Sequence, residues 1–267
     1  MASPVQNNQP TQLLVGMDVG STTAKIAVMD ATSHEVLMRR YVRHHAQQAN
    51  CLKGLLAELD QQFGGVPIRA ALCGSGGAAL AEALNLPYVQ EVVANSLAVG
   101  AHYPTARTAI ELGGQDAKMI FFKYDKEANR LSVADMRMNG SCAGGTGAFV
   151  DEIATLLKVP TEQFNDLAQQ GEAVHNVSGR CGVYAKTDIQ PLLNQGVPKA
   201  DIALSSFHAI AKQTIGGLAQ GLEIEAPVVF EGGPLTFNPR LIAVFAERLE
   251  LGREDIIIPN HPETIVA

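Results

Sequence analysis

The spacing of apolar and polar positions changes along the chain in a way that predicts alternating strands and helices. Residues 13–20 (LLVGMDVG), 24–30 (AKIAVMD) and 35–43 (EVLMRRYVR) are short apolar runs separated by turn-like segments, so they predict three successive strands. Residues 49–65 carry apolar side chains at helical spacing and end in two glycines, which predicts a helix. Residues 68–77 (IRAALCGSGG) predict a strand that leads into another glycine turn.

The same pattern begins again near the middle of the chain. Residues 108–124 (TAIELGGQDAKMIFFKY) predict a strand, an acidic residue, glycines and a second strand, and they echo residues 15–30 (VGMDVGSTTAKIAVMD). From residue 145 the pattern is mostly helical until a buried-strand run at 226–234 (APVVFEGGP). A helical pattern at 237–251 and a short apolar run follow it. The internal repeat predicts two related α/β halves.

Composition and charge narrow the classes of partner. The chain has 267 residues, of which 46% are hydrophobic, as in one large or two medium globular domains. A net charge of −7 argues against nucleic acid and anionic membranes as partners. Residues 1–12 are predicted to be a flexible tail and not a signal peptide, and no stretch approaches the length of a membrane span.

The cysteines point to a reducing compartment. Without an export signal, disulfides are not expected, and we expect a cytoplasmic protein. The spacing contains no CxxC pair, so a zinc site built by one chain is not expected either. The four residues are Cys51, Cys73, Cys142 and Cys181.

Three strand-to-glycine turns each carry an acidic residue at or near the strand end. Glycine lets backbone N–H groups approach a phosphate, hydroxyls donate to its oxygens, and a carboxylate holds Mg²⁺ through water. A single turn of this kind is common, but three in this order predict a nucleotide cleft between two halves. The turns are Asp18 with Gly20, Ser21 and Thr22; Glu111 with Gly113, Gly114, Gln115 and Asp116; and Glu231 with Gly232 and Gly233.

Other phosphate-binding patterns are weaker or missing. No GxxxxGK(S/T) motif occurs, so a Walker-type NTPase is not expected. The run CGSGGAALAEAL imitates a dinucleotide fingerprint, but the third glycine position is Ala79, and we interpret this turn as structural.

The turns and two cysteine motifs carry a resemblance to a known family. GMDVGSTTAKIAV, IELGGQDAKMI and VVFEGGP resemble the first phosphate, second phosphate and adenosine motifs of the acetate and sugar kinase, Hsp70 and actin superfamily. NGSCAGGTGAF and SGRCGVYAKTDIQPLLNQG are similar to signatures of the BadF/BadG/BcrA/BcrD ATPases, the activators of 2-hydroxyacyl-CoA dehydratases. The resemblance implies an actin-like, ribonuclease H-like α/β fold with two related domains, 13–106 and 107–267, around a nucleotide cleft.

The resemblance also implies an ATPase that binds ATP or ADP with Mg²⁺. Asp18 would hold Mg²⁺ through water, and Gln115 with Asp116 would position water and metal. Glu111 stands where many superfamily members carry Asp, so its longer reach leaves its metal role open. The other expected nucleotide contacts are Gly20, Ser21, Thr22, Thr23, Lys25, Gly113, Gly114, Glu231, Gly232 and Gly233, the last two on the adenosine side.

Cys142 and Cys181 each precede a predicted helix, whose positive end would favour a thiolate or a negatively charged cluster. On spacing alone, ordinary buried cysteines are an equal alternative. The resemblance implies that two subunits contribute two cysteines each to one bridging 4Fe–4S cluster, which requires a homodimer. Cys51 and Cys73 are expected to be packing residues.

The function implied by the resemblance is ATP-dependent electron transfer. A ferredoxin or flavodoxin would reduce the cluster, ATP hydrolysis would change the angle between the flanking helices, and the electron would pass to a dehydratase-type iron–sulfur partner. Two alternatives are a small-molecule kinase of the same fold and a non-catalytic nucleotide-sensing module. The kinase needs a substrate-binding insertion and a base that are not apparent, and the sensing module would not need Cys142 or Cys181.

Two further segments have two interpretations each, and a third has one. Residues 39–45 (RRYVRHH) form either a docking patch for an acidic partner or a solvated strand face, and no histidine lies in a catalytic signature. Residues 186–188 (KTD) lie either near the cluster or dimer interface, or only cap a helix. The run EGGPLTFNPRL looks most like large fused activase-like proteins, and a return helix usual in the superfamily is not apparent, so we expect a fragment of a longer protein.

Overall fold

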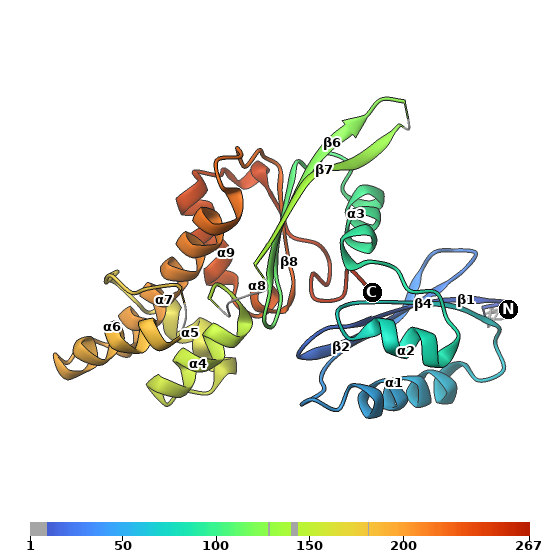
Figure 1. The fold of residues 1–267 in the computed structure, drawn as a ribbon, viewed down its shortest axis with the longest axis horizontal. Helices are drawn as coiled ribbons and strands as arrows, with labels where there is room; N and C mark the ends of the chain where they lie inside the picture. Colours follow the sequence, from blue (N-terminus) through green and yellow to red (C-terminus); the bar gives the residue numbers. More distant parts are fainter. Residues whose placement is uncertain (1–9, 128, 140–143, 181) are drawn as a thin grey trace, which may run out of the picture. The chain divides into compact units, whose positions relative to one another are not determined.

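The chain folds into two compact units. The computed structural model describes residues 10–127, 129–139, 144–180 and 182–267 (Figure 1). One unit comprises Met1–Asn95 with Val266–Ala267, and the other comprises Ser96–Ile265. The division falls within helix α3 (Glu91–His102), whereas the sequence analysis places the boundary after residue 106.

The first unit contains a four-stranded sheet in the order β3-β2-β1-β4. Strands β1 (Leu13–Val19), β2 (Thr23–Asp30) and β3 (Val36–Arg43) form an antiparallel meander, and β4 (Ile68–Cys73) pairs with β1 in parallel. The three successive strands predicted from the sequence are therefore confirmed, with ends that differ by only a residue or so.

One face of this sheet is covered by α1 (Gln48–Phe63) (Figure 1). Its apolar residues recur at helical spacing, so they share one face of the helix and pack with the inward side chains of β1 and β2. A shorter helix, α2 (Gly77–Leu84), follows β4 and the glycine turn. The buried residues of α1 are Leu52, Leu55 and Leu59.

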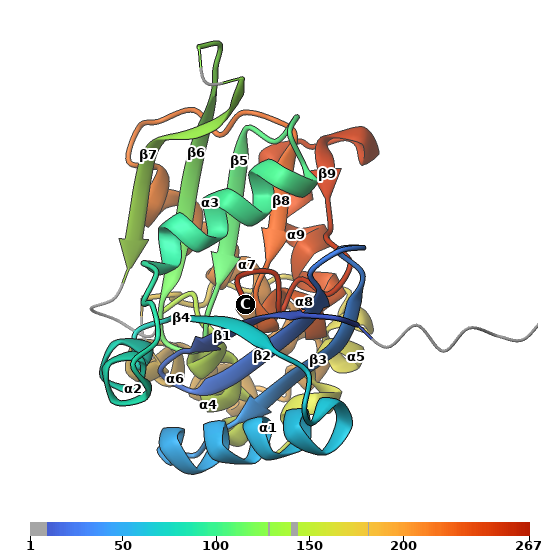
Figure 2. The same cartoon turned by 90° about the vertical axis from the view of Figure 1, so that its right-hand side faces the viewer.

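The second unit contains a five-stranded sheet in the order β7-β6-β5-β8-β9 (Figure 2). Strands β5 (Thr108–Leu112), β6 (Ala117–Asp125) and β7 (Arg130–Asn139) form an antiparallel meander, and β8 (Val228–Glu231) pairs with β5 in parallel. The short strand β9 (Ile256–Ile257) extends the sheet beyond β8.

Strand β7 is absent from the sequence prediction. Its polar residues Asp135 and Arg137 interrupt the apolar alternation, and most of its side chains are only half-buried. It forms because β6 offers a long edge with which it pairs from Ala117 opposite Asn139 to Asp125 opposite Arg130. Pairing of this kind comes from backbone hydrogen bonds and is therefore invisible to a hydrophobic pattern.

Most helices of the second unit lie on one side of its sheet (Figure 1). The central one, α7, is buried along almost its whole length. No helix in the described ranges combines the length and apolar composition that a bilayer span requires. The elements are α4 (Gly147–Leu157), η1 (Thr161–Gln163), α5 (Phe164–Gln169), α6 (Gly182–Asn194), α7 (Lys199–Thr214), η2 (Ile215–Ala219), α8 (Gly233–Phe237), α9 (Pro239–Leu249) and η3 (Arg253–Asp255).

The two sheets share one topology. In each, three antiparallel strands are followed by a fourth that pairs in parallel with the first, so β3-β2-β1-β4 corresponds to β7-β6-β5-β8. The strand-turn-strand echo seen in the sequence is β1-β2 in one unit and β5-β6 in the other. The predicted pair of related α/β halves is thereby confirmed.

Candidate functional site

The first glycine turn joins β1 to β2 as a tight hairpin loop. The N–H of Gly20 donates to the carbonyl oxygen of Thr23 at 2.9 Å, so Ser21 and Thr22 form the tip. Ser21 is exposed, and Thr22 is half-buried. The tip residues therefore present backbone N–H groups and hydroxyls at the end of the hairpin, as a phosphate site requires.

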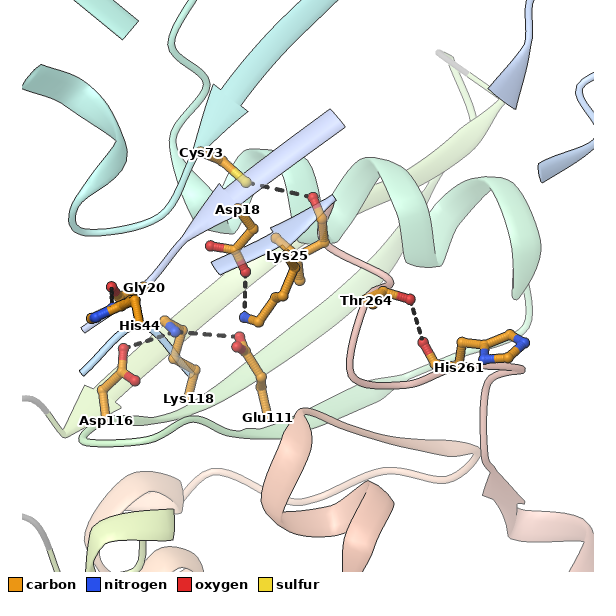
Figure 3. A network of polar contacts seen from close by, with 11 residues as sticks. Asp18, Gly20, Lys25, His44, Cys73, Glu111, Asp116, Lys118, His261 and Thr264 are labelled. Carbon is orange, nitrogen blue, oxygen red and sulfur yellow. Dashed lines mark hydrogen bonds and ion pairs between the residues drawn. The ribbon is translucent and has the colours of Figure 1, made fainter. Parts of the chain in front are cut away.

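Asp18 lies just before this turn and is fully buried. It stands opposite Lys25 in the pairing of β1 with β2, and the two side chains form an ion pair (Figure 3). The second carboxylate oxygen, Oδ1, is also buried and finds no hydrogen-bond donor among the described residues. A buried carboxylate oxygen without a donor is costly, so its environment suits a cation or bound water.

The second glycine turn is built in the same way. The N–H of Gly113 donates to the carbonyl oxygen of Asp116 at 2.8 Å, and the exposed Gln115 lies at the tip. Glu111, 4% exposed, precedes the turn, and its Oε2 lies 3.3 Å from Nζ of Lys118 on β6 (Figure 3). Asp116 Oδ2 lies 2.9 Å from the same Nζ, so one buried ammonium serves two carboxylates.

Lys118 is a site residue that the sequence analysis missed. It stands opposite Glu111 in the strand pairing, as Lys25 stands opposite Asp18. In both turns the lysine follows the acid by seven positions, so aligning VGMDVGSTTAK with AIELGGQDAK reveals it. The sequence prediction includes Lys25 of the first turn but not Lys118, its counterpart in the second.

The carboxylates of the second turn outnumber their lysine. Glu111 and Asp116 together carry two negative charges against the one of Lys118. Glu111 Oε2 is buried and, although ion-paired, lacks the geometry of a hydrogen bond to any described residue. Hard oxygen ligands with excess negative charge are the donor set that Mg²⁺ prefers, so these residues fit a magnesium ion held directly or through water.

A glycine at the end of the neighbouring parallel strand packs against each turn. Gly74, after β4, and Gly232, after β8, have φ of +87° and +93°, a region that favours glycine. A Cβ on Gly74 would overlap the Asp18 carboxylate and the Val19 carbonyl oxygen, and one on Gly232 would overlap the carbonyl oxygen of Leu112. The turn at residues 73–77, interpreted from sequence as structural, thus lies against Asp18.

The third predicted turn, after β8, corresponds in the second unit to the Gly74 turn after β4. Glu231 ends β8 in a fully buried position and pairs in register with Glu111 of β5. Gly232 leads into α8, whose first turn contains Pro234. The N–H of Gly232 donates to the carbonyl oxygen of Pro262 at 3.1 Å, which anchors the turn.

The N-terminus of α4 is attached to the second glycine turn. The N–H groups of Gly147 and Ala148 donate to the carbonyl oxygens of Gly113 and Gly114, at 3.0 and 2.8 Å. A Cβ on Gly147 would lie 3.0 Å from Cγ of Pro234, so the adenosine-type motif touches the same helix end. Two N–H groups at the positive end of this helix therefore bind the carbonyl oxygens of the turn.

Cys142 and Cys181 lie outside the described residues, but their neighbours are described. A Cβ on Gly144 would overlap the carbonyl oxygen of Arg180, so these two backbones are in contact. A Cβ on Gly182, the first residue of α6, would overlap the carboxylate of Glu152 from α4. The segments that flank the two cysteines therefore pack against each other.

The residues of the KTD segment hold these elements together. Lys186 Nζ lies 2.9 Å from Glu152 Oε1, which joins α6 to α4. Asp188 Oδ2 accepts a hydrogen bond from the N–H of Ser178 at 2.8 Å, which joins α6 to the segment that leads into it. Thr187 bonds within its own helix. The structure thus gives these side chains contacts that brace the helix.

The other two cysteines have packing environments. Cys73 is buried, and its Sγ donates to the carbonyl oxygen of Val266 at 3.5 Å. Cys51 is half-buried in α1, and burial raises the pKa of its thiol. Over the described part of the chain, no group of three or more His, Cys, Asp or Glu side chains is arranged to hold a metal ion.

The fold and these turns define an actin-like ATPase. A model of the BadF/BadG/BcrA/BcrD ATPase family matches residues 15–263, and the chain belongs to this family. It is 26% identical over 220 residues to the (R)-2-hydroxyglutaryl-CoA dehydratase activating ATPase of Acidaminococcus fermentans, which covers 82% of each chain. It is 27% identical to an uncharacterised protein of Methanocaldococcus jannaschii over 95% of this chain and 97% of that one.

Solved structures agree on the fold. The crystal structure of component A of the A. fermentans (R)-2-hydroxyglutaryl-CoA dehydratase matches with a TM-score of 0.82 and 23% identity, covering 96% of this chain and 94% of the other. The activator of the 2-hydroxyisocaproyl-CoA dehydratase from Clostridium difficile, solved with ADPNP, matches with a TM-score of 0.79 and 22% identity, covering 96% and 91%. The predicted actin-like fold is confirmed, and family membership implies nucleotide binding.

Proposed function

We propose that this protein is an ATP-hydrolysing activator that passes a low-potential electron to a dehydratase-type iron–sulfur partner. The observation that carries the proposal is the attachment of α4 to the second glycine turn. Gly147 and Ala148 bind the carbonyl oxygens of Gly113 and Gly114, and α4 begins a few residues after Cys142. A change in the turn would therefore move the first residues of α4, which follow Cys142 in the sequence.

The nucleotide half of the reaction uses the two carboxylate–lysine pairs. Asp18 in the first turn and Glu111 in the second would each hold Mg²⁺ directly or through water, the charge of the metal would neutralise the phosphates, and Gln115 with Asp116 would orient the attacking water. The products are ADP and phosphate. In the first turn, Ser21 and Thr22 would donate hydrogen bonds to the phosphates. The other proposed contacts are Gly20, Thr23, Lys25, Lys118, Gly113, Gly114, Glu231, Gly232 and Gly233.

The coupling step follows from the hydrogen bonds of α4. The N–H of Gly114 is proposed to donate a hydrogen bond to a phosphate, and the carbonyl oxygen of Gly114 accepts a hydrogen bond from the N–H of Ala148. Because the peptide groups are rigid, loss of the γ-phosphate and rotation at Gly114 would shift the first turn of α4. The two states of the turn thus correspond to two positions of the helix.

The electron-transfer half requires thiolates at Cys142 and Cys181. A bound 4Fe–4S cluster, shared by two subunits, would supply a one-electron carrier. The contact of Gly144 with Arg180 supports a common site, because it brings together the segments in which the two cysteines occur. A ferredoxin or flavodoxin is the proposed electron donor.

Iron analysis after anaerobic purification tests this proposal. We expect a brown dimer with about four iron and four sulfide per two chains. Cys142→Ser and Cys181→Ser should each lose the iron, whereas the control Cys51→Ser, in half-buried α1, should retain it. Because the colour and iron content are measured without turnover, they do not depend on identifying the acceptor.

ATP consumption separates the proposal from a kinase of the same fold. The activator should hydrolyse MgATP to ADP and phosphate with no small-molecule acceptor present. A colourless, iron-free protein that consumes ATP only with a phosphoryl acceptor would contradict the activator and support the kinase. Nucleotide binding with neither iron nor hydrolysis would support the sensing module.

A further inference from the structure

His44 is a buried histidine attached to the first glycine turn by two hydrogen bonds. It follows β3 directly, in the run RRYVRHH, and is 4% exposed. Its backbone N–H donates to the carbonyl oxygen of Thr22 at 3.1 Å. Its ring nitrogen Nε2 lies 3.1 Å from the carbonyl oxygen of Gly20 (Figure 3). A docking patch and a solvated strand face would both expose this run, whereas His44 is buried.

The protonation of the ring follows from its second contact. The backbone N–H of Ala46 donates to His44 Nδ1 at 3.1 Å. Because an N–H can only donate, Nδ1 must carry a lone pair and no proton. The Nε2 atom of the neutral ring therefore carries the hydrogen and donates it to Gly20. The two contacts require one tautomer.

The chain after His44 is held in an unusual conformation. His45 and Ala46 have φ of +46° and +61°, and two consecutive non-glycine residues in this region are costly. The bond from Ala46 N–H to the ring and that from Gln47 N–H to the His44 carbonyl oxygen, at 2.7 Å, maintain this bend. Strained backbone that is held by several contacts occurs most often at functional sites.

We propose that His44 is a positioning residue that sets the direction of the backbone N–H of Ser21. In a planar trans peptide the C=O of one residue and the N–H of the next point in opposite directions. Holding the Gly20 carbonyl toward the ring therefore turns the Ser21 N–H away from it. This inference deepens the proposed function, on which it rests, because the N–H of Ser21 is proposed to donate a hydrogen bond to a phosphate.

Two variants separate the ring's donor from its bulk. His44→Leu removes the donor and the acceptor, whereas His44→Gln keeps an amide N–H that can donate to Gly20. In the nucleotide-free protein, we expect amide exchange at Gly20 and at residue 44, relative to the intrinsic rate of each residue type, to rise about tenfold in His44→Leu and to stay within about threefold of the native value in His44→Gln. The control His45→Asn, at an exposed neighbour that Asn tolerates, should change neither.

Ring ¹⁵N NMR and MgADP titration complete the test. We expect His44 to show the neutral Nε2–H tautomer and His44→Leu to bind MgADP about tenfold more weakly than His44→Gln. An Nδ1–H tautomer, or native exchange and MgADP affinity in His44→Leu, would overturn the inference. Wild-type protein that binds no MgADP would contradict the proposed function instead, while exchange and tautomer still decide whether His44 holds the turn.

Discussion

Lys118 lies 3.3 Å from Glu111 across strands β5 and β6, and both side chains are almost completely buried. Asp18 and Lys25 repeat the relationship across β1 and β2. Two related hairpins thus place an acid at the end of one strand and a lysine at the start of the next. Each pair leaves one buried carboxylate oxygen beside a glycine turn without a hydrogen bond from a described residue. The candidate nucleotide site depends on this common feature.

Removing the buried ammonium should destabilise the protein strongly. In Lys118→Met, Glu111 and Asp116 lose their shared cation, so we expect the free energy of unfolding to fall by about 3–5 kcal/mol. Urea unfolding measures the change. Lys123→Met, at an exposed position of the same strand, should cost less than about 0.5 kcal/mol. Equal losses in the two variants would show that the charge of Lys118 is not needed.

Neutralising Glu111 should weaken the requirement for magnesium. Glu111→Gln keeps the shape of the side chain but removes its charge, so we expect the affinity for MgADP to fall about 10- to 100-fold. Titration of ADP with and without Mg²⁺ distinguishes a metal effect from a loss of nucleotide contact. Glu127→Gln, in the exposed hairpin, is the control. An unchanged magnesium dependence would exclude Glu111 as a metal-holding residue.

Gly74 should be far less replaceable than Gly65, although both have positive φ. Their φ values are +87° and +84°, but a Cβ on Gly65 meets nothing within 4 Å, whereas one on Gly74 overlaps Asp18. We expect Gly65→Ala to cost about 1 kcal/mol from backbone strain alone. Gly74→Ala should cost clearly more in urea unfolding and should weaken MgADP binding. Equal costs would mean that backbone conformation, and not contact with Asp18, is the reason that position 74 requires glycine.

The stability contributed by Asp201 should depend on pH. Its Oδ1 accepts hydrogen bonds from the N–H groups of Glu172 and Ala173, at 2.8 and 3.2 Å, which hold the pKa of the carboxyl below its usual value of 3.8. A lowered folded pKa stabilises the protein above the unfolded pKa, and this contribution is lost as pH falls through the folded value.

Asp201→Asn should therefore unfold at lower urea than the native protein at neutral pH, and the difference should shrink as pH falls below 3.8. Urea midpoints at neutral and acidic pH measure it, with Asp60→Asn on the exposed side of α1 as the control. A difference that persists undiminished at the most acidic pH would mean that the carboxylate charge is not responsible.

Much of the fold could be predicted from local sequence patterns. Strands β1, β2, β5 and β6 were predictable because alternating apolar side chains and short glycine turns are local signals. The helices α1, α4, α6 and α9 were predictable from apolar spacing in the same way. Strand β7 was not, because its stability comes from pairing with β6 and not from its own side chains.

The same distinction applies to the candidate site. Acid and glycine types at strand ends pointed to Asp18, Glu111 and Glu231, and the internal repeat contained the information for Lys118. His44 and Gly74 carried no comparable signal. Each acts through a contact with a residue distant in sequence, Gly20 for the ring and Asp18 for the glycine.

By itself, the sequence determined the family, the order of most elements and the residue types of the turns, because these depend on local periodicity and motif. Only the tertiary structure decided which lysine neutralises which acid, which glycine must lack a side chain, and where the first N–H groups of α4 bind. Those outcomes depend on distances between segments far apart in the chain, which folding sets by packing whole strands and helices together.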